Sequence, residues 1–181
     1  ISSNRIVWIF CKKTKREKMM IRKELGFLGL KLVLMAGVIV LLFGVIFGFC
    51  QTQDDSMNPT IKEGDLILYY RLQKNYQHSD VVVVQKEGTV QIRRIIATEG
   101  DQVDITEDGL KINGYLQQET QIYEETLPYV GAISFPVIVG KDEYFVLGDE
   151  RKTAEDSRIY GSVKKEEIKG GIISLFRRRG L

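Results

Sequence analysis

The feature that most constrains this chain is an uninterrupted apolar run near its N-terminus. Leu32 to Cys50 reads LVLMAGVIVLLFGVIFGFC, nineteen residues without a charge, Asn, Gln or Pro. A helix of that length crosses the hydrocarbon core of a bilayer, which is roughly 30 Å thick. A core helix of a small soluble domain would need a polar face, and this run has none. The run therefore predicts a single membrane anchor over residues 32–50.

The distribution of charge predicts how the anchor is oriented. Residues 1–31 hold nine Lys or Arg and two Glu, a net charge of +7, whereas residues 32–181 carry 17 basic and 22 acidic side chains, a net charge of −5. Because basic flanks stay in the cytoplasm, residues 1–31 are expected there and residues 51–181 outside the cell membrane. A basic arm outside the folded domain favours membrane lipid over nucleic acid as a partner.

The anchor is expected to remain uncleaved. The apolar run is longer than the hydrophobic region of a signal peptide, and its exit, FGFCQTQDD, has no small-x-small cleavage pattern. Phe49 directly before Cys50 argues against a lipoprotein attachment site, where a small residue would stand. The sequence begins with Ile and reaches Met19 and Met20 only later, so we hypothesise that translation starts at one of these methionines and that residues 1–18 are not translated.

Beyond the anchor, short apolar runs separated by turn residues predict an antiparallel all-β domain over residues 51–181. Residues 164–168 are expected to form a helical turn, and residues 117–141 a long surface excursion. Asn113-Gly114 suits a tight hairpin. The predicted strands are Leu66–Tyr70, Val81–Gln85, Thr89–Ala97, Val103–Ile105, Leu110–Ile112, Tyr144–Leu147 and Gly171–Phe176.

Two short segments carry residues of possible chemical importance. SMNPT contains Ser56, six residues after Cys50 and so within roughly 20 Å of the membrane surface. Taken alone, it is equally well a simple turn. QIRRIIA places Arg93 and Arg94 inside an apolar strand, where an edge strand with two solvated side chains is the plain interpretation.

Together with two further segments, these resemble the type I signal peptidases, membrane-anchored Ser-Lys endopeptidases that remove signal peptides from exported proteins. SMNPT at 56–60 is similar to the nucleophile motif Ser-Met-x-Pro-Thr, and Gly-Asp at 64–65 to the next motif. RRIIATEGD at 93–101 is similar to the Lys-Arg-x-x-Gly-x-Pro-Gly-Asp block. GDERKTAEDSRIYG at 148–161 is similar to Gly-Asp-Asn-x-x-x-Ser-x-Asp-Ser-Arg-x-x-Gly. The resemblance covers the chain from about Met20.

The resemblance implies that Ser56 stands at the nucleophile position and Arg93 at the position of the lysine base. Lysine serves as a base because burial lowers its pKa, but a neutral guanidinium at pH 7 would cost about 7.5 kcal/mol. The serine that supports the lysine corresponds to Ala154, which has no hydroxyl. Asp54 stands on the side of the oxyanion hole, where a carboxylate would repel the developing charge.

Other family positions are retained. The resemblance implies structural roles for Arg94, Asp149, Asp156 and Arg158 and substrate contacts for two residues of the nucleophile motif, Met57 and Pro59. No cofactor is implied, and one His and two Cys on opposite sides of the membrane cannot form a metal site.

Three other basic segments have plain interpretations. His78 in NYQHSD is expected to be a solvated loop residue rather than a base for Ser56. Lys86 is expected to be solvated in a hairpin turn. The tail FRRRGL at 176–181 reads as a solvated strand end, with a lipid-binding patch as the alternative.

Three hypotheses follow. In the first, the chain is a signal-peptidase-like protein that binds exported clients, signal peptides or pilin-like proteins, without cutting them. Signal-peptidase-like proteins with altered dyads accompany pilus and sortase gene clusters, so the assembly machinery would be a partner. In the second, Ser56 still acts as the nucleophile of an active signal peptidase, with water or another group as base. In the third, Arg93 pairs with Asp54 or Asp55 and closes the former site.

Overall fold

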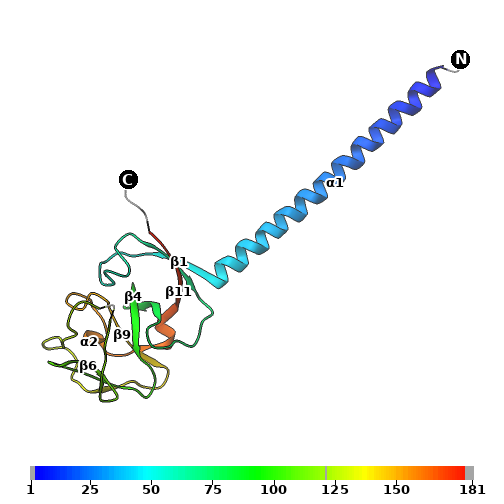
Figure 1. The fold of residues 1–181 in the computed structure, drawn as a ribbon. Helices are drawn as coiled ribbons and strands as arrows, with labels where there is room; N and C mark the ends of the chain where they lie inside the picture. The colour runs from blue at the N-terminus through cyan, green and yellow to red at the C-terminus, as the bar shows by residue number, and fades with distance from the viewer. Residues whose placement is uncertain (1–2, 121, 178–181) are drawn as a thin grey trace. The chain divides into compact units, whose positions relative to one another are not determined.

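The computed structural model describes residues 3–120 and 122–177, which divide into two compact units between Gly44 and Val45. The first unit is formed by one continuous helix, α1 (Ser3–Ile46), whose last two residues fall in the second unit (Figure 1). Within the described residues, one helix is long and apolar enough to cross a membrane, over Met20–Ile46 with a mean hydropathy of 2.6. The helix ends four residues before the predicted end of the anchor, because Phe47–Cys50 belong to the first strand instead.

The second unit is built from strands, as the sequence predicts. All strand pairs are antiparallel. The short helix α2 (Ser157–Tyr160) and the 3-10 turn η1 (Lys165–Glu167) interrupt the strands near the C-terminus. The strands are β1 (Phe47–Gln51), β2 (Leu66–Tyr70), β3 (Val81–Lys86), β4 (Thr89–Ala97), β5 (Gln102–Thr106), β6 (Gly109–Ile112), β7 (Tyr115–Leu116), β8 (Val137–Ile138), β9 (Glu143–Leu147), β10 (Val163–Lys164) and β11 (Ile168–Phe176).

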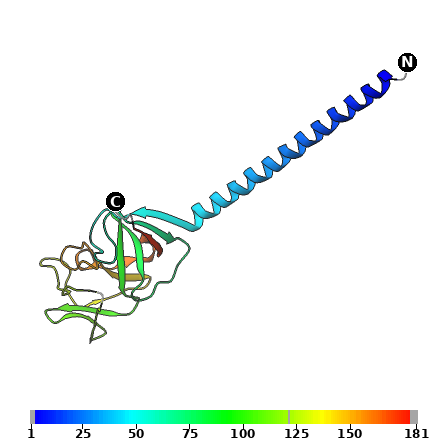
Figure 2. The ribbon, with the colours of Figure 1, turned by 45° about the horizontal axis from the view of Figure 1, so that its top comes forward.

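Two sheets share these strands. The larger has the order β1-β2-β11-β3-β4-β9-β10 and the smaller the order β7-β6-β5-β8. β3 and β4 are antiparallel neighbours, and their green arrows can be followed side by side in Figure 2. Because β4 lies between β3 and β9, the prediction of an edge strand around Arg93 and Arg94 is wrong. The two arginines therefore enter the interior of the domain and need partners there.

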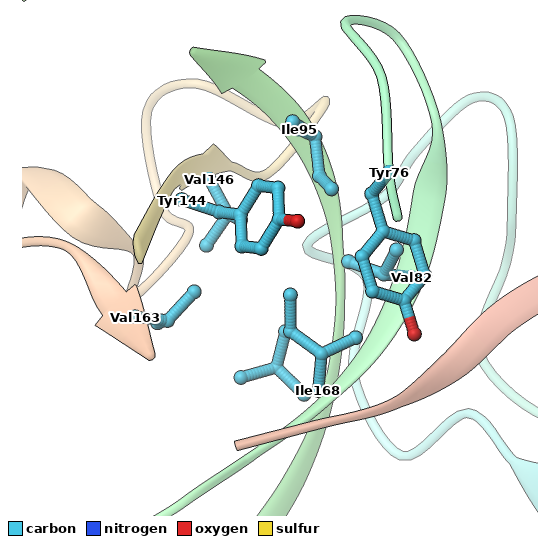
Figure 3. Close-up of a cluster of buried hydrophobic side chains, with 8 residues drawn as sticks. Tyr76, Val82, Ile95, Tyr144, Val146, Val163 and Ile168 are labelled. Carbon is cyan, nitrogen blue, oxygen red and sulfur yellow. The ribbon is translucent and has the colours of Figure 1, made fainter. Parts of the chain in front are cut away.

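Three clusters of buried side chains form the core of the β domain. In the first, side chains of β3, β4, β9, β10 and β11 meet Tyr76 from the preceding loop (Figure 3). The Tyr76 and Tyr144 rings cross edge to face, with 5.6 Å between their centroids. The second cluster lies between the two sheets' strands around Val103, Phe145 and Leu147. The third, around Met57, Ile67 and Ile92, underlies the SMNPT segment and thereby fixes the segment to the large sheet.

The seven predicted strands all occur. Two keep their predicted bounds, and the other five are longer by one to three residues at one or both ends. The helical turn predicted at 164–168 is η1. β1 was hidden inside the apolar run, and β7, β8 and β10 have two residues each. Residues 117–141 are irregular apart from β8 in the part of the chain that the structure describes, which agrees with the predicted excursion.

Candidate active site

Ser56 lies at the start of the SMNPT turn, and its side chain faces a carboxylate. The residue is buried, with 8% exposed. Its hydroxyl donates to Asp54 Oδ2 at 2.9 Å, and its amide approaches Asp54 Oδ1 at 3.4 Å. The Asp54 carboxylate, which the resemblance places on the side of the oxyanion hole, thus accepts the hydrogen bond of the Ser56 hydroxyl. The Asp54 side chain is half exposed.

Arg93 is one of the most buried side chains of the domain, with 1% exposed. Its Nε and Nη2 donate to the Glu155 carbonyl oxygen at 2.9 and 2.7 Å, and Nη1 donates to the Ile92 carbonyl oxygen at 2.6 Å. The nearest carboxylate contact is Nη2 to Asp54 Oδ2 at 3.8 Å. Backbone carbonyl oxygens therefore satisfy most of the guanidinium, and Asp54 is its charge partner.

Ala154 meets Ser56 around Gly148. A Cβ on Gly148 would lie 2.3 Å from the Ala154 Cβ and 2.6 Å from the Ser56 carbonyl oxygen, so only glycine fits between them. The Glu150 amide donates to that same carbonyl oxygen at 3.0 Å. The fold thus brings the positions implied as nucleophile, base and supporting serine into one site, with a hydroxyl at the first, a guanidinium at the second and a methyl group at the third.

The four residues implied to be structural form two buried ion pairs. Arg94 donates to both oxygens of Asp149 at 2.8 and 2.6 Å, and this carboxylate raises the pKa of Arg94. Asp156 accepts from Arg158 Nε and Nη2 at 2.9 and 2.8 Å, and also from the Gly148 amide. Both carboxylates are fully buried, so the guanidinium partners offset the cost of desolvation.

The two residues implied to contact substrate lie in different environments. Met57 is 2% exposed and packs with Ile61, Ile67 and Ile92. Pro59 is exposed at the surface of the turn. Substrate contact by either residue stays a prediction.

Two basic side chains outside the site have firm partners. His78 Nδ1 lies 2.8 Å from the Ile96 carbonyl oxygen and Nε2 lies 3.2 Å from Asp101 Oδ2, so the ring is tied to the strand end and not to Ser56. The Lys86 ammonium donates to Glu167 at 2.9 Å, so the prediction of a solvated Lys86 is wrong. The Lys86 side chain thus connects the β3–β4 hairpin to η1.

The remaining sequence predictions concern cysteine, metal and the tail. Cys50 is a free thiol on β1. Within residues 3–120 and 122–177, no group of His, Cys, Asp and Glu is arranged to hold a metal ion. Arg177 pairs with Asp65 at 3.0 Å, and the rest of the predicted tail lies outside the described residues.

Two titratable groups border the site. Burial raises the pKa of Tyr160 well above its usual value, although the Arg93 guanidinium beside it acts in the opposite direction. Hydrogen bonding with the neighbouring Glu124 carboxyl raises the pKa of Glu150, whose amide contacts Ser56. Among the described residues, the hydrogen-bond partner of the Ser56 hydroxyl is Asp54 and neither Tyr160 nor Glu150.

Sequence reasoning missed a set of contacts that hold the far side of the site. Arg151 is fully buried and donates to both oxygens of Glu119 and to the Thr126 hydroxyl. The Tyr129 hydroxyl lies 3.1 Å from the Ala154 carbonyl oxygen. One signal was available, since the excursion carries the acidic stretch QETQIYEET and the site motif carries the basic pair of GDERK.

Chemically, the site contains a hydroxyl, a carboxylate that accepts its proton in a hydrogen bond, and a guanidinium that cannot act as a base at neutral pH. A lysine amine is absent from the described contacts of Ser56. Asp54 is the acceptor that contacts the Ser56 hydroxyl.

Comparison with known proteins gives consistent similarities. Residues 26–176 match the family described as signal peptidase, peptidase S26. Signal peptidase I P of Bacillus subtilis subsp. natto is 29% identical over 155 residues, which cover 78% of this chain and 83% of the relative. Signal peptidase I of Bacillus licheniformis is 28% identical over 167 residues, which cover 85% of this chain and 90% of the relative.

A crystal structure of a signal peptidase I from Enterococcus faecalis V583 covers 56% of this chain and 98% of its own, with 26% identity and a TM-score of 0.46. The family match extends over most of the chain and includes every site residue described above. The chain belongs to the signal peptidase S26 family.

Proposed function

We propose that this chain is a membrane-anchored signal peptidase I-like protein that binds exported proteins at the outer face of the cell membrane without cutting them. The observation that carries the proposal is Arg93. The family's base position holds a guanidinium that is 1% exposed and donates to the Glu155 and Ile92 carbonyl oxygens. A group fixed in this way has no neutral form available near pH 7 to take the Ser56 proton.

Two neighbouring positions support the same conclusion. Ala154 offers no hydroxyl to orient a base, and the Asp54 carboxylate lies against Ser56, where negative charge would build up during acyl transfer. Catalysis by this route depends on donors, not carboxylates, aimed at that charge. Binding of an extended peptide requires neither, since main-chain hydrogen bonds and side-chain pockets provide the affinity.

The proposed clients are signal peptides or pilin-like exported proteins, and the proposed partner is a sortase or pilus assembly machinery. The altered residues at the Ser-Lys positions support this choice, because such changes occur in the signal-peptidase-like proteins that accompany those systems. The basic N-terminal arm supports a cytoplasmic N-terminus with the β domain outside. The 3.8 Å contact between Arg93 and Asp54 supports a closed, charge-compensated site.

A second candidate function is retained proteolysis with Asp54 as the base. The supporting observation is the 2.9 Å hydrogen bond from the Ser56 hydroxyl to Asp54 Oδ2. In this scheme the carboxylate takes the hydroxyl proton as Ser56 attacks the scissile carbonyl, and the resulting carboxylic acid returns the proton to the leaving amine. The negative charge of Asp54 near the developing oxyanion opposes this reaction.

A cleavage and binding assay separates the two functions. Full-length protein in detergent micelles is incubated with a fluorescent synthetic signal peptide, and both bound peptide and cleavage products are measured. The variants are Ser56→Ala, Asp54→Asn and the double variant Arg93→Lys/Ala154→Ser. We expect the wild type to bind the peptide with cleavage at the background rate, and the double variant to cut at least about a hundredfold above that background, the usual contribution of a general base.

The outcomes are distinct. Cleavage by the wild type that disappears in both Ser56→Ala and Asp54→Asn would establish the second candidate. Cleavage that disappears in Ser56→Ala but persists in Asp54→Asn would indicate a different base and would contradict both schemes. A wild type that neither binds nor cuts the peptide would overturn the proposed binding function for this client class.

A further inference from the structure

The far side of the Ser56 site is formed by one irregular loop, residues 148–156, called the wall loop here. Its Glu150 amide donates to the Ser56 carbonyl oxygen at 3.0 Å, and its Glu155 carbonyl oxygen accepts from Arg93. Ala154 lies between them on the same loop. The wall loop contains no strand or helix. Within it the Ala154 amide donates to the Glu150 carbonyl oxygen and the Gly148 amide to Asp156, and contacts from outside add to these in fixing its position.

A second irregular segment holds it. Residues 117–120 and 122–130, called the strap here, contact the wall loop through Arg151. This guanidinium donates to both Glu119 carboxylate oxygens at 2.5 and 2.6 Å, to the Thr126 hydroxyl, and through Nε to the Gly148 carbonyl oxygen at 2.8 Å. One fully buried side chain thus joins the strap to the glycine against which Ser56 and Ala154 pack.

Further contacts lie along the same seam. The Tyr129 hydroxyl is 3.0 Å from the Lys152 carbonyl oxygen and 3.1 Å from the Ala154 carbonyl oxygen. The Arg158 guanidinium lies 4.4 Å above the Tyr129 ring, and its Nη1 donates to the Leu127 carbonyl oxygen at 3.2 Å. The strap therefore contacts the wall loop at Lys152 and Ala154 and also contacts Arg158 on α2, directly after the loop.

We propose that Glu119 and Arg151 are positioning residues that hold the wall loop in register with Ser56. Neither side chain contacts Ser56, so the pair acts through the Gly148 carbonyl oxygen and the loop that follows it. A buried guanidinium without its carboxylate must find another partner or reach solvent, and either movement would release Gly148. The inference deepens the proposed function and rests on it in one respect, namely that clients bind at the Ser56 site.

Hydrogen exchange of the full-length protein in detergent micelles tests the proposal. The reporting amides are Gly148, Glu150 and Ala154, which donate to Asp156, Ser56 and Glu150. The test variants are Glu119→Gln and the double variant Glu119→Leu/Arg151→Met. The double variant replaces the ion pair with apolar side chains, a change that often preserves overall stability.

Glu167→Gln is the matched control, because it breaks the comparable Lys86–Glu167 ion pair on η1. We expect exchange of the three reporting amides to accelerate at least about tenfold in both test variants, the effect of losing one charged hydrogen bond. Amides of β4 and β9 should exchange at the wild-type rate, and the control should leave the wall loop unchanged.

Two results would overturn the proposal. One is a folded double variant whose reporting amides keep wild-type protection. The other is equal loss of protection in β4, β9 and the wall loop in both test variants, which would make the pair a general stabiliser. Peptide binding is measured in parallel: faster wall-loop exchange in a protein whose wild type binds no peptide would support the positioning role and refute the proposed function.

Discussion

Arg93 and Arg94 are neighbours on β4, yet their side chains leave the strand on opposite faces and find different kinds of partner. Arg94 meets the Asp149 carboxylate in a two-bond ion pair. Arg93 donates hydrogen bonds to two carbonyl oxygens, which carry no net charge. Its positive charge is compensated by Asp54, whose carboxylate lies 3.8 Å away. The first arginine therefore stabilises the fold, whereas the second determines the electrostatics of the Ser56 site.

The Arg94–Asp149 pair yields a prediction for stability. Asp149→Asn removes the buried negative charge and leaves the Arg94 guanidinium, whose side chain is 13% exposed, without a counterion. Breaking a buried ion pair from one side costs about 3 kcal/mol in the free energy of unfolding. Urea denaturation, monitored by far-UV circular dichroism of the β domain, measures this change.

Lys111→Gln serves as the control, because it breaks the surface pair between Lys111 on β6 and Asp108 in the preceding turn. Exposed pairs contribute little to folding, so the urea midpoint should match the wild type. Equal midpoints for Asp149→Asn and the wild type would show that the Arg94 charge is accommodated elsewhere.

At the scale of elements, β1 connects the anchor to the domain. Its five residues pair in register with β2, and the Tyr69 ring lies so close to Gly48 that a Cβ there would be 2.2 Å away. Phe47 also packs on Tyr70, with ring centroids 5.9 Å apart. An element that reads as the end of a membrane segment is thus an edge strand of the large sheet.

A truncation series tests the role of β1. A fragment of residues 45–181 keeps β1 and is expected to fold with the β signal of the whole domain, since this range is one compact unit. A fragment of residues 52–181 lacks the β1–β2 pairing and should unfold at a clearly lower temperature. Circular dichroism melting curves compare the two. Equal melting temperatures would mean that β1 contributes nothing to the domain.

The sequence predicts long or well-bounded elements and fails on short or concealed ones, for physical reasons. Thr89–Ala97 is nine residues long, begins directly after the turn residue Gly88 and is recovered with its bounds intact. β8 and β10 have two residues each, too few to show any period. β1 is invisible because a half-buried apolar strand and the end of an apolar helix have the same composition.

The same division applies to the site. Ser56, Arg93 and Ala154 lie in motifs and could be assigned from the resemblance, and the structure brings them together. The Glu119–Arg151 contact joins residues 32 positions apart, both of them in irregular segments. The hydrogen bond from Ser56 to Asp54 depends on the turn geometry. Local sequence patterns contain neither the contacts between distant residues nor the geometry of a turn.

At the scale of the whole molecule, buried carboxylates govern the response to acid. Burial disfavours the charged forms of Asp65 and Asp101, but hydrogen bonds from Arg177 to the first and from Thr98 and Asn113 to the second outweigh it and lower both pKa values. A carboxylate with a lowered pKa in the folded state stabilises the fold above its unfolded pKa, and this contribution disappears as the pH falls through the folded value.

We therefore expect the urea midpoint to fall as the pH is lowered from about 5 towards 3. Asp101→Asn, which cannot titrate, should show a shallower dependence over the same range. The measurement is a series of urea titrations in buffers of constant ionic strength. A midpoint that rises on acidification would contradict the lowered pKa values.

Membrane topology provides the second whole-molecule prediction. With α1 spanning the membrane and basic residues on the cytoplasmic side, protease added to intact cells without a cell wall should digest the β domain and spare a tag placed before the helix. Lysed cells are the control, in which both parts become accessible. Digestion of the tag in intact cells would reverse the proposed orientation.

The direct passage from α1 to β1 has a consequence for binding. The helix ends at Ile46, the strand begins at Phe47, and Ser56 follows ten residues after the helix end. The chain therefore keeps the site within roughly 35 Å of the end of the helix. Under the proposed function, a client held in the same bilayer would meet the site at an effective concentration on the order of millimolar. The affinity for a free peptide in solution would therefore understate the occupancy of the site on the membrane.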